Sequence, residues 1–150
     1  MAVQRDENSK LGGDSLSVEW SENNPLAILG FQLNLKHKFS ANTSFFSFLA
    51  TKKEPALCFL SEPYFNASDE LVPKLTGLQI IRGKAKFPRA IILASRALNL
   101  WTIDRFCNRD LATAMWETGQ TGLQNIVVTS LYAPIEEQVL ANETLDSLIT

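Results

Sequence analysis

The sequence predicts an α+β fold, in which a strand–helix–strand unit is followed by mostly antiparallel strands. The first observation is the segment 27–35, where Phe31, Leu33 and Leu35 alternate with polar residues as in a half-buried strand. The second is a change of character after residue 77, where short apolar runs are separated by turn residues, a pattern typical of antiparallel strands. These runs are residues 78–81, 90–94, 98–103, 111–115 and 126–131.

A helix of about three turns is predicted between the first two strands. Ser40, Asn42 or Thr43 is expected to cap its start, and four apolar residues between positions 45 and 49 recur at helical spacing. Lys-Lys-Glu-Pro at 52–55 would end it. A second apolar strand follows, and two strands joined in this way lie parallel and finish at the same edge of a sheet.

Polar side chains with metal- and phosphate-binding chemistry stand at these strand ends. Asn34 ends the first strand and Glu62 the second, so the two would lie side by side, and both carry oxygen ligands suited to magnesium. Tyr132, at the end of the last strand, and His37 are able to bond a phosphate oxygen. The plainer alternatives are a solvated turn at Glu62-Pro63 and an ordinary surface histidine.

Two further groups of charged residues are candidates for contact with a nucleic acid. Arg109 and Asp110 form either part of a site or a simple ion pair within a turn. A basic loop either holds a phosphate backbone or is only solvated. Its residues are Arg82, Lys84, Lys86 and Arg89. The formal charge of -2 gives no overall basic field, so any contact with DNA would have to come from such a local patch.

Length and composition are those of one ordinary domain. The chain has 150 residues, of which 45% are hydrophobic. Residues 1–24 are polar and predict a flexible tail, residues 25–150 a single domain, and residues 135–149 an amphipathic helix. Cys58 and Cys107 have no metal-binding or disulfide spacing, which fits an intracellular chain. Neither a signal peptide nor a membrane-spanning segment is predicted.

Five short motifs occur in an order and at intervals that resemble a known family. They are Gln-Leu-Asn-Leu-Lys-His at 32–37, Ser-Glu-Pro-Tyr at 61–64, Pro-Arg-Ala at 88–90, Arg-Asp-Leu at 109–111 and Ser-Leu-Tyr-Ala-Pro at 130–134. Over about residues 27–140 they resemble the endonuclease domain of insect-type non-LTR retrotransposons. That domain belongs to the exonuclease–endonuclease–phosphatase superfamily.

The resemblance implies a four-layered sandwich, with two mixed sheets face to face and helices outside. It also implies cleavage of a DNA phosphodiester with Mg²⁺ or Mn²⁺ as the cofactor. Asn34 matches the active-site asparagine of the family and, with Glu62, is expected to hold the metal. Tyr132 matches the tyrosine that contacts the scissile phosphate. An active enzyme of this kind would work in the nucleus.

The resemblance also assigns expected substrate contacts, and it has gaps. Arg109 and Asp110 match a recurrent pair near the same cleft, and Arg89 lies in the third motif, so all three are expected on the substrate side. The sequence holds neither the Gly-Asp-Phe-Asn segment nor the Ser-Asp-His segment of the family, which carry further catalytic groups. We therefore expect the N-terminal part of an endonuclease domain, inactive alone.

Two alternatives to the enzyme remain open at this point. One is a non-catalytic remnant that at most binds metal or DNA weakly, and the other is a plain α/β interaction domain without nuclease ancestry. A truncated second sheet would leave Ile91, Leu93 and Val127 without cover. Open sheet edges would then favour self-association.

Overall fold

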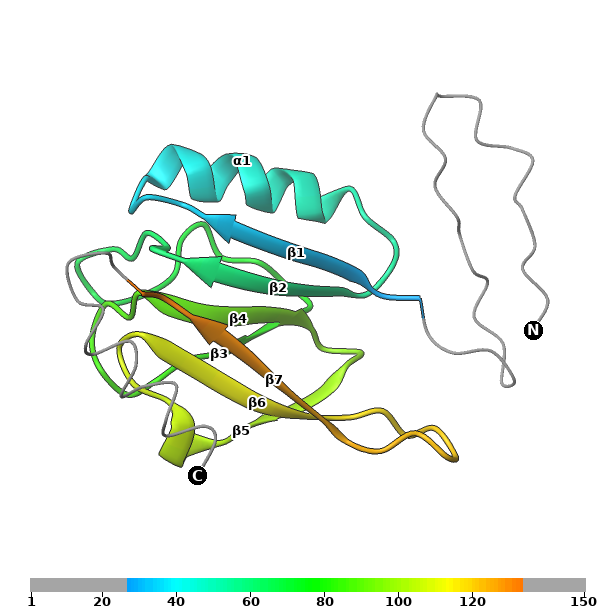
Figure 1. Ribbon diagram of the computed structural model, residues 1–150. Coiled ribbons are helices and arrows are strands. Elements are labelled where there is room, and N and C mark those ends of the chain that lie inside the picture. The colour runs from blue at the N-terminus through cyan, green and yellow to red at the C-terminus, as the bar shows by residue number, and fades with distance from the viewer. Residues whose placement is uncertain (1–26, 134–150) are drawn as a thin grey trace.

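The structure is a computed structural model that describes residues 27–133 of the chain, and it confirms the α+β class (Figure 1). The elements are β1 (Leu29–Asn34), α1 (Phe39–Ala50), β2 (Ala56–Ser61), β3 (Leu78–Ile81), β4 (Ala90–Ser95), β5 (Asn99–Thr102), the 3-10 turn η1 (Asp104–Phe106), β6 (Leu111–Glu117) and β7 (Ile126–Leu131). The predicted tail 1–24 and the predicted helix 135–149 lie outside the described residues. Among the described residues, no helix has the length and apolar character needed to cross a membrane.

The strands form two sheets. The first has the order β1-β2-β4-β3, with β1 and β2 parallel and the other neighbours antiparallel. The second has the order β5-β6-β7 and is antiparallel throughout. The predicted antiparallel strands are therefore present, but they are divided between the two sheets of a sandwich.

Strand β4 is buried on both faces and fixes the order of the layers. Ile91 and Leu93 pack in one core cluster with Phe46 of α1, and Ile92 packs in the other with Ala112 of β6. Figure 1 accordingly shows α1 on the outer side of the first sheet. The prediction that Ile91 and Leu93 lose their cover is wrong, because both face the helix and are at most 1% exposed.

Val127, in contrast, is exposed as expected. It lies on β7 beside Ile126, and the two side chains are 54% and 38% exposed. In the described part of the chain β7 pairs with β6 on one side. Self-association through this sheet stays a prediction.

The start of α1 differs from the predicted capping. The helix begins at Phe39, after an N-cap at Lys38 that makes no side-chain capping bond, so Ser40, Asn42 and Thr43 all lie inside it. The hydroxyl of Thr43 donates instead to the carbonyl of Phe39 at 2.9 Å. The sequence pattern predicted the position of the helix correctly, but it placed the N-cap two or more residues after Lys38.

Asn42 has a structural role that the sequence did not reveal. Its side chain is fully buried, and its amide nitrogen donates to the carbonyls of Tyr64 and Val72 at 2.9 and 2.8 Å. Its amide oxygen accepts from the N–H of Tyr64 at 3.2 Å. These bonds satisfy backbone groups of the long loop after β2 and attach that loop to α1.

Asn42→Ala is expected to lower the free energy of unfolding by about 2–4 kcal/mol, because it leaves buried backbone groups without partners. Urea denaturation followed by circular dichroism measures this. Ser44→Ala, an exposed site on the same helix, is the matched control and should change stability by less than about 0.5 kcal/mol. Equal effects of the two substitutions would contradict the role given to Asn42.

Candidate active site

The site is built by the parallel pairing of β1 and β2. The register runs from Leu29 opposite Ala56 to Asn34 opposite Ser61, so both strands end at the same level. Glu62 follows at once and stands beside Asn34, as the strand–helix–strand pattern predicts. In Figure 1 the arrowheads of β1, β2 and β7 point to the same end of the sandwich.

Left-handed backbone shapes the two loops that leave these strands. The φ angles are +51° at Lys36, +53° at His37 and +48° at Glu62, a conformation that costs a residue with a side chain about 1–2 kcal/mol. The N–H of His37 donates to the carbonyl of Glu62 at 2.7 Å, which joins the two loops. Residues held in such conformations cluster at functional sites.

Side chains from the ends of β1 and β7 converge on the carboxylate of Glu62, which follows the end of β2. Tyr132, after β7, donates its hydroxyl to Oε1 at 2.8 Å. His37, after β1, places Nε2 3.7 Å from the same oxygen. Asn34 lies beside Glu62, and its side chain helps to hold the pKa of that carboxyl below its ordinary value. The Glu62 side chain is 20% exposed, so it is held firmly but remains open to solvent.

Asn34 uses both ends of its amide. Its Oδ1 accepts from the N–H of Lys36 at 2.8 Å, which leaves Nδ2 as the end able to donate to the Glu62 carboxylate. In this arrangement Asn34 orients the carboxylate. Its role as a metal ligand stays a prediction. In that role Oδ1 would have to accept from the N–H of Lys36 and bind the cation at the same time.

These donors stabilise the ionised form of Glu62. The Tyr132 hydroxyl holds the pKa of the Glu62 carboxyl below its ordinary value, burial opposes this in part, and Asn34 and His37 add to the lowering. The same bond raises the pKa of the Tyr132 phenol. Glu62 is therefore a carboxylate at neutral pH, the state that a cation requires.

Arg89 and Asp110 support the tyrosine. The Arg89 guanidinium forms a two-point bond with the Asp110 carboxylate, at 2.5 and 2.7 Å, and lies 4.9 Å from the centre of the Tyr132 ring. The N–H of Tyr132 donates to the Asp110 carbonyl at 2.9 Å. Asp110 thus pairs with Arg89 and not with its neighbour Arg109, so the simple turn ion pair is a wrong prediction. Arg109 is exposed beside them.

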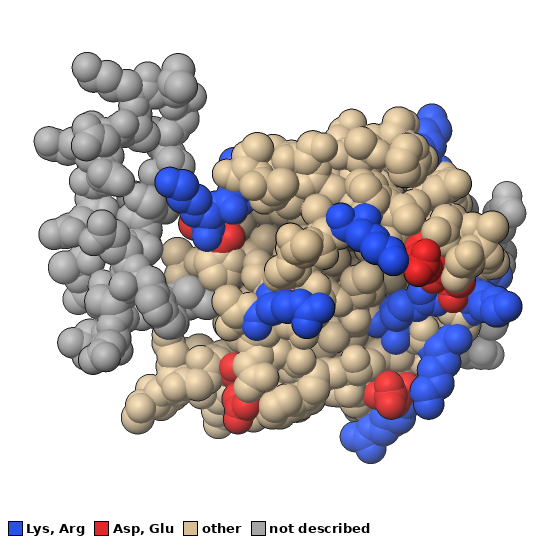
Figure 2. All heavy atoms as spheres, turned by 180° about the vertical axis from the view of Figure 1, so that it is seen from behind, with Lys and Arg blue, Asp and Glu red and all other residues tan. Residues whose placement is uncertain are grey.

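The basic loop is divided between two environments. Arg82 pairs with Asp69 at 2.8 Å and stacks over Phe65, so it is a structural residue. Lys84 and Lys86 are exposed. Figure 2 shows Lys and Arg in separate groups on the face opposite to that of Figure 1, several of them beside Asp or Glu, so this face presents no continuous basic field.

Two contacts of the site escaped the sequence reasoning. His37 lies against Glu62, although the two are 25 positions apart in the numbering, and Lys36 engages Asn34 through its backbone. The available signal was that Lys36 and His37 directly follow the strand that ends at Asn34. Among residues 27–133, no group of three or more His, Cys, Asp or Glu side chains is placed to hold a metal ion. A cation here would have few protein ligands.

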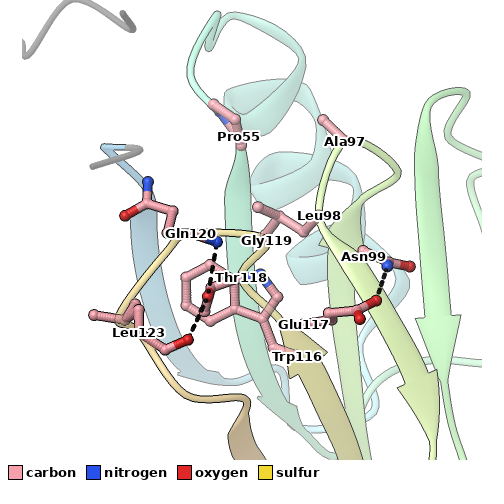
Figure 3. Close-up of a pocket in the computed structure, with 10 residues that line it drawn as sticks. All are labelled: Pro55, Ala97, Leu98, Asn99, Trp116, Glu117, Thr118, Gly119, Gln120 and Leu123. Carbon is pink, nitrogen blue, oxygen red and sulfur yellow. Dashed lines mark hydrogen bonds between the residues drawn. The ribbon is translucent and has the colours of Figure 1, made fainter. Parts of the chain in front are cut away.

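An apolar cavity of about 590 Å³ lies at the other end of the sandwich (Figure 3). It borders Pro55, which precedes β2, whereas Glu62 follows the end of that strand. In Figure 3 the hydroxyl of Thr118 lies between Gln120 and Leu123, to which it is hydrogen-bonded. The cavity is therefore separate from the carboxylate site. Its lining is Pro55, Ala97, Leu98, Asn99, Trp116, Glu117, Thr118, Gly119, Gln120 and Leu123.

The chain folds as a two-sheet α+β sandwich with a carboxylate at the end of β2. Among solved structures, the chain is similar to the endonuclease domain of TRAS1, a telomere-specific non-LTR retrotransposon, with a TM-score of 0.57 and 19% sequence identity. The match covers 84% of this chain and 54% of that one, so the chain spans about half of its structural relative. No family model and no curated protein matches the sequence. The resemblance predicted from the motifs is thereby confirmed for the fold.

Tyr132→Phe is expected to raise the pKa of Glu62, because it removes the hydrogen bond that contributes most to the lowering. The depressed pKa stabilises the fold above the pKa of the unfolded chain, and that contribution is lost as the pH falls through the folded value. The variant should therefore lose less stability on acidification. Carboxyl ¹³C NMR titration measures the pKa, and Tyr64→Phe, at the other tyrosine of the chain, is the control. An unchanged Glu62 pKa would contradict the assignment.

Proposed function

We propose that the site around Glu62 is the cation- and phosphate-binding part of a metal-dependent DNA endonuclease, with Mg²⁺ or Mn²⁺ as the cation. The observation that carries this proposal is the convergence of Asn34, Glu62 and Tyr132 from three different strand ends. The likeness of the fold to a retrotransposon endonuclease domain supports it. If the chain is active on DNA, we expect it to work in the nucleus.

The residues fit a hard divalent cation in chemistry and charge. Glu62 supplies an ionised carboxylate, and the amide oxygen of Asn34 is a second oxygen donor if it shares its lone pairs with Lys36. A bound cation would neutralise charge on the phosphate oxygens. Tyr132 holds the carboxylate through its hydroxyl and presents that hydroxyl where a phosphate oxygen would compete for it.

Basic side chains near the site are suited to attract the DNA backbone. Lys36 and Lys38 are exposed in the loop that carries His37, and Arg109 is exposed next to Asp110. They provide local positive charge on a chain whose formal charge is -2. Arg89 contributes indirectly, because its guanidinium is engaged by Asp110.

A second candidate function is a non-catalytic domain that binds a cation and DNA. The observation in its favour is that Glu62 is the single carboxylate at the convergence point, with no cluster of three metal-binding side chains in the described region. Hydrolysis needs a further group to activate water. We therefore propose that the chain by itself binds its ligands and nicks DNA slowly at most.

The first test is cation binding by isothermal titration calorimetry with Mg²⁺ and Mn²⁺. Glu62→Gln, which keeps the shape of the side chain and removes its charge, is expected to weaken both affinities at least about tenfold, a loss of about 1.4 kcal/mol. Glu70→Gln, at an exposed glutamate of the following loop, should leave them unchanged. Equal binding by wild type and Glu62→Gln would refute the proposed site.

The second test is nicking of supercoiled plasmid with and without Mg²⁺. We expect the wild-type chain to stay close to the background of the folded Glu62→Gln variant, because losing members of a catalytic unit costs several orders of magnitude in rate. Mg²⁺-dependent nicking well above that background would show that the chain alone is a competent nuclease. That result would exclude the non-catalytic alternative.

A further inference from the structure

His37 is held beside Glu62 in a defined orientation. Its Nδ1 lies 3.4 Å from the carbonyl oxygen of Pro63, and its Nε2 lies 3.7 Å from Oε1 of Glu62. Because a carbonyl only accepts, the Nδ1 contact requires the proton on Nδ1. In the neutral ring, the form that can bind a cation, the lone pair of Nε2 then faces the side of the carboxylate.

This is the arrangement of a metal-ligating histidine. Such residues typically donate one ring N–H to a backbone carbonyl or carboxylate, which fixes the tautomer and directs the other nitrogen to the metal. With metal–ligand distances of about 2.0–2.2 Å, two ligands of one ion lie roughly 3 to 4.4 Å apart. The separation of 3.7 Å between Nε2 and Oε1 falls within that range.

The backbone holds this pair in place. His37 and Glu62 both adopt left-handed conformations, with φ of +53° and +48°, and the N–H of His37 donates to the carbonyl of Glu62 at 2.7 Å. Strained residues persist where the surrounding structure over-determines them, and they cluster at ligand-binding sites. Here the strain brings the only histidine of the chain to the candidate cation site.

The second oxygen ligand proposed for the site, Oδ1 of Asn34, is not free of other contacts. Oδ1 of Asn34 is already bonded to the N–H of Lys36, so the nitrogen of His37 is the better-placed partner for Glu62. We propose that His37 Nε2 is a ligand of the cation at Glu62, and that the site therefore binds Co²⁺ more tightly than Mg²⁺. Imidazole suits first-row transition ions, whereas Mg²⁺ takes oxygen ligands. This inference rests on the proposed cation site.

Positively charged side chains near the site change the affinity for divalent cations but not the preference for Co²⁺ over Mg²⁺. Lys36 and Lys38 flank His37 and are exposed, and Arg89 interacts electrostatically with Glu62. Their repulsion weakens the binding of every divalent cation by a similar factor. The ratio of the Co²⁺ and Mg²⁺ affinities is therefore the quantity that reports the nitrogen ligand.

The experiment compares Co²⁺ and Mg²⁺ titrations of wild type, His37→Asn and Lys36→Asn by calorimetry at pH 8. Asn tolerates left-handed backbone, and the Lys36 variant makes the same kind of change at the adjacent left-handed position without touching the imidazole. We expect His37→Asn to weaken Co²⁺ binding at least about tenfold with little effect on Mg²⁺, and Lys36→Asn to strengthen both slightly and leave their ratio unchanged. An unchanged Co²⁺ affinity in folded His37→Asn would overturn the proposal.

NMR of the single imidazole gives a second readout. Sub-stoichiometric Co²⁺ should give the ring protons of His37 the large through-bond contact shifts of a coordinated imidazole in wild type, beyond the through-space broadening that any Co²⁺ at Glu62 causes, and should do so far less in Glu62→Gln. If Mg²⁺ binds through Glu62 while Co²⁺ produces no contact shifts of the imidazole, the ligand role of His37 fails and the proposed function stands. If neither ion binds the folded protein, both fail.

Discussion

The parallel pairing of β1 with β2 is the constraint on which the site depends. A chain that returns through one helix must place its two strands parallel, so their carboxyl ends share one edge of the sheet. The register brings Asn34 and Ser61 level, and the next residue is Glu62. A shift of one residue would turn every side chain of β1 to the opposite face and remove Asn34 from the carboxylate. Phe31 and Leu33 of β1 pack against the core cluster that holds Phe46 and Leu60, and this packing opposes the shift.

The second sheet contributes the remaining contacts of the site. Tyr132 reaches Glu62 because β7 ends at the same end of the sandwich as β2, and the hydroxyl of Ser130 reaches across the layers to the carbonyl of Leu60 at 3.5 Å. Arg89 and Asp110 connect the start of β4 with the start of β6 through their two-point bond. The carboxylate is therefore positioned by the packing of the two sheets together.

Local patterns predicted the elements, and through them the nearness of Asn34 and Glu62. Alternation identified β1, the apolar run identified β2, and the Lys-Lys-Glu-Pro segment marked the end of α1. These are short-range signals. The same signals could not show which face of β4 meets the helix, because Ile91 and Ile92 are both apolar and both buried.

The hydrogen-bond and ion-pair partners of residues far apart in sequence could not be predicted, for a related reason. Asp110 has an arginine next to it in sequence, yet it pairs with Arg89, 21 positions away, because the sandwich brings the starts of β4 and β6 together. Asn42 has the residue type of a helix cap and instead fixes a loop, because a buried position with three backbone partners outweighs local capping preference. Sequence gives the residue types available for such contacts, whereas the packing of distant elements chooses among them.

The backbone conformation of Glu62 is held by bonds that do not involve its carboxylate. Left-handed backbone at a non-glycine residue costs about 1–2 kcal/mol, and here both backbone polar groups are engaged, with the N–H donating to the Arg89 carbonyl at 2.8 Å and the carbonyl accepting from His37 at 2.7 Å. These bonds come from neighbouring strands and loops and do not involve the carboxylate. The backbone of the site is therefore fixed whatever charge position 62 carries, so differences in cation affinity between Glu62 and an uncharged isostere report the carboxylate itself.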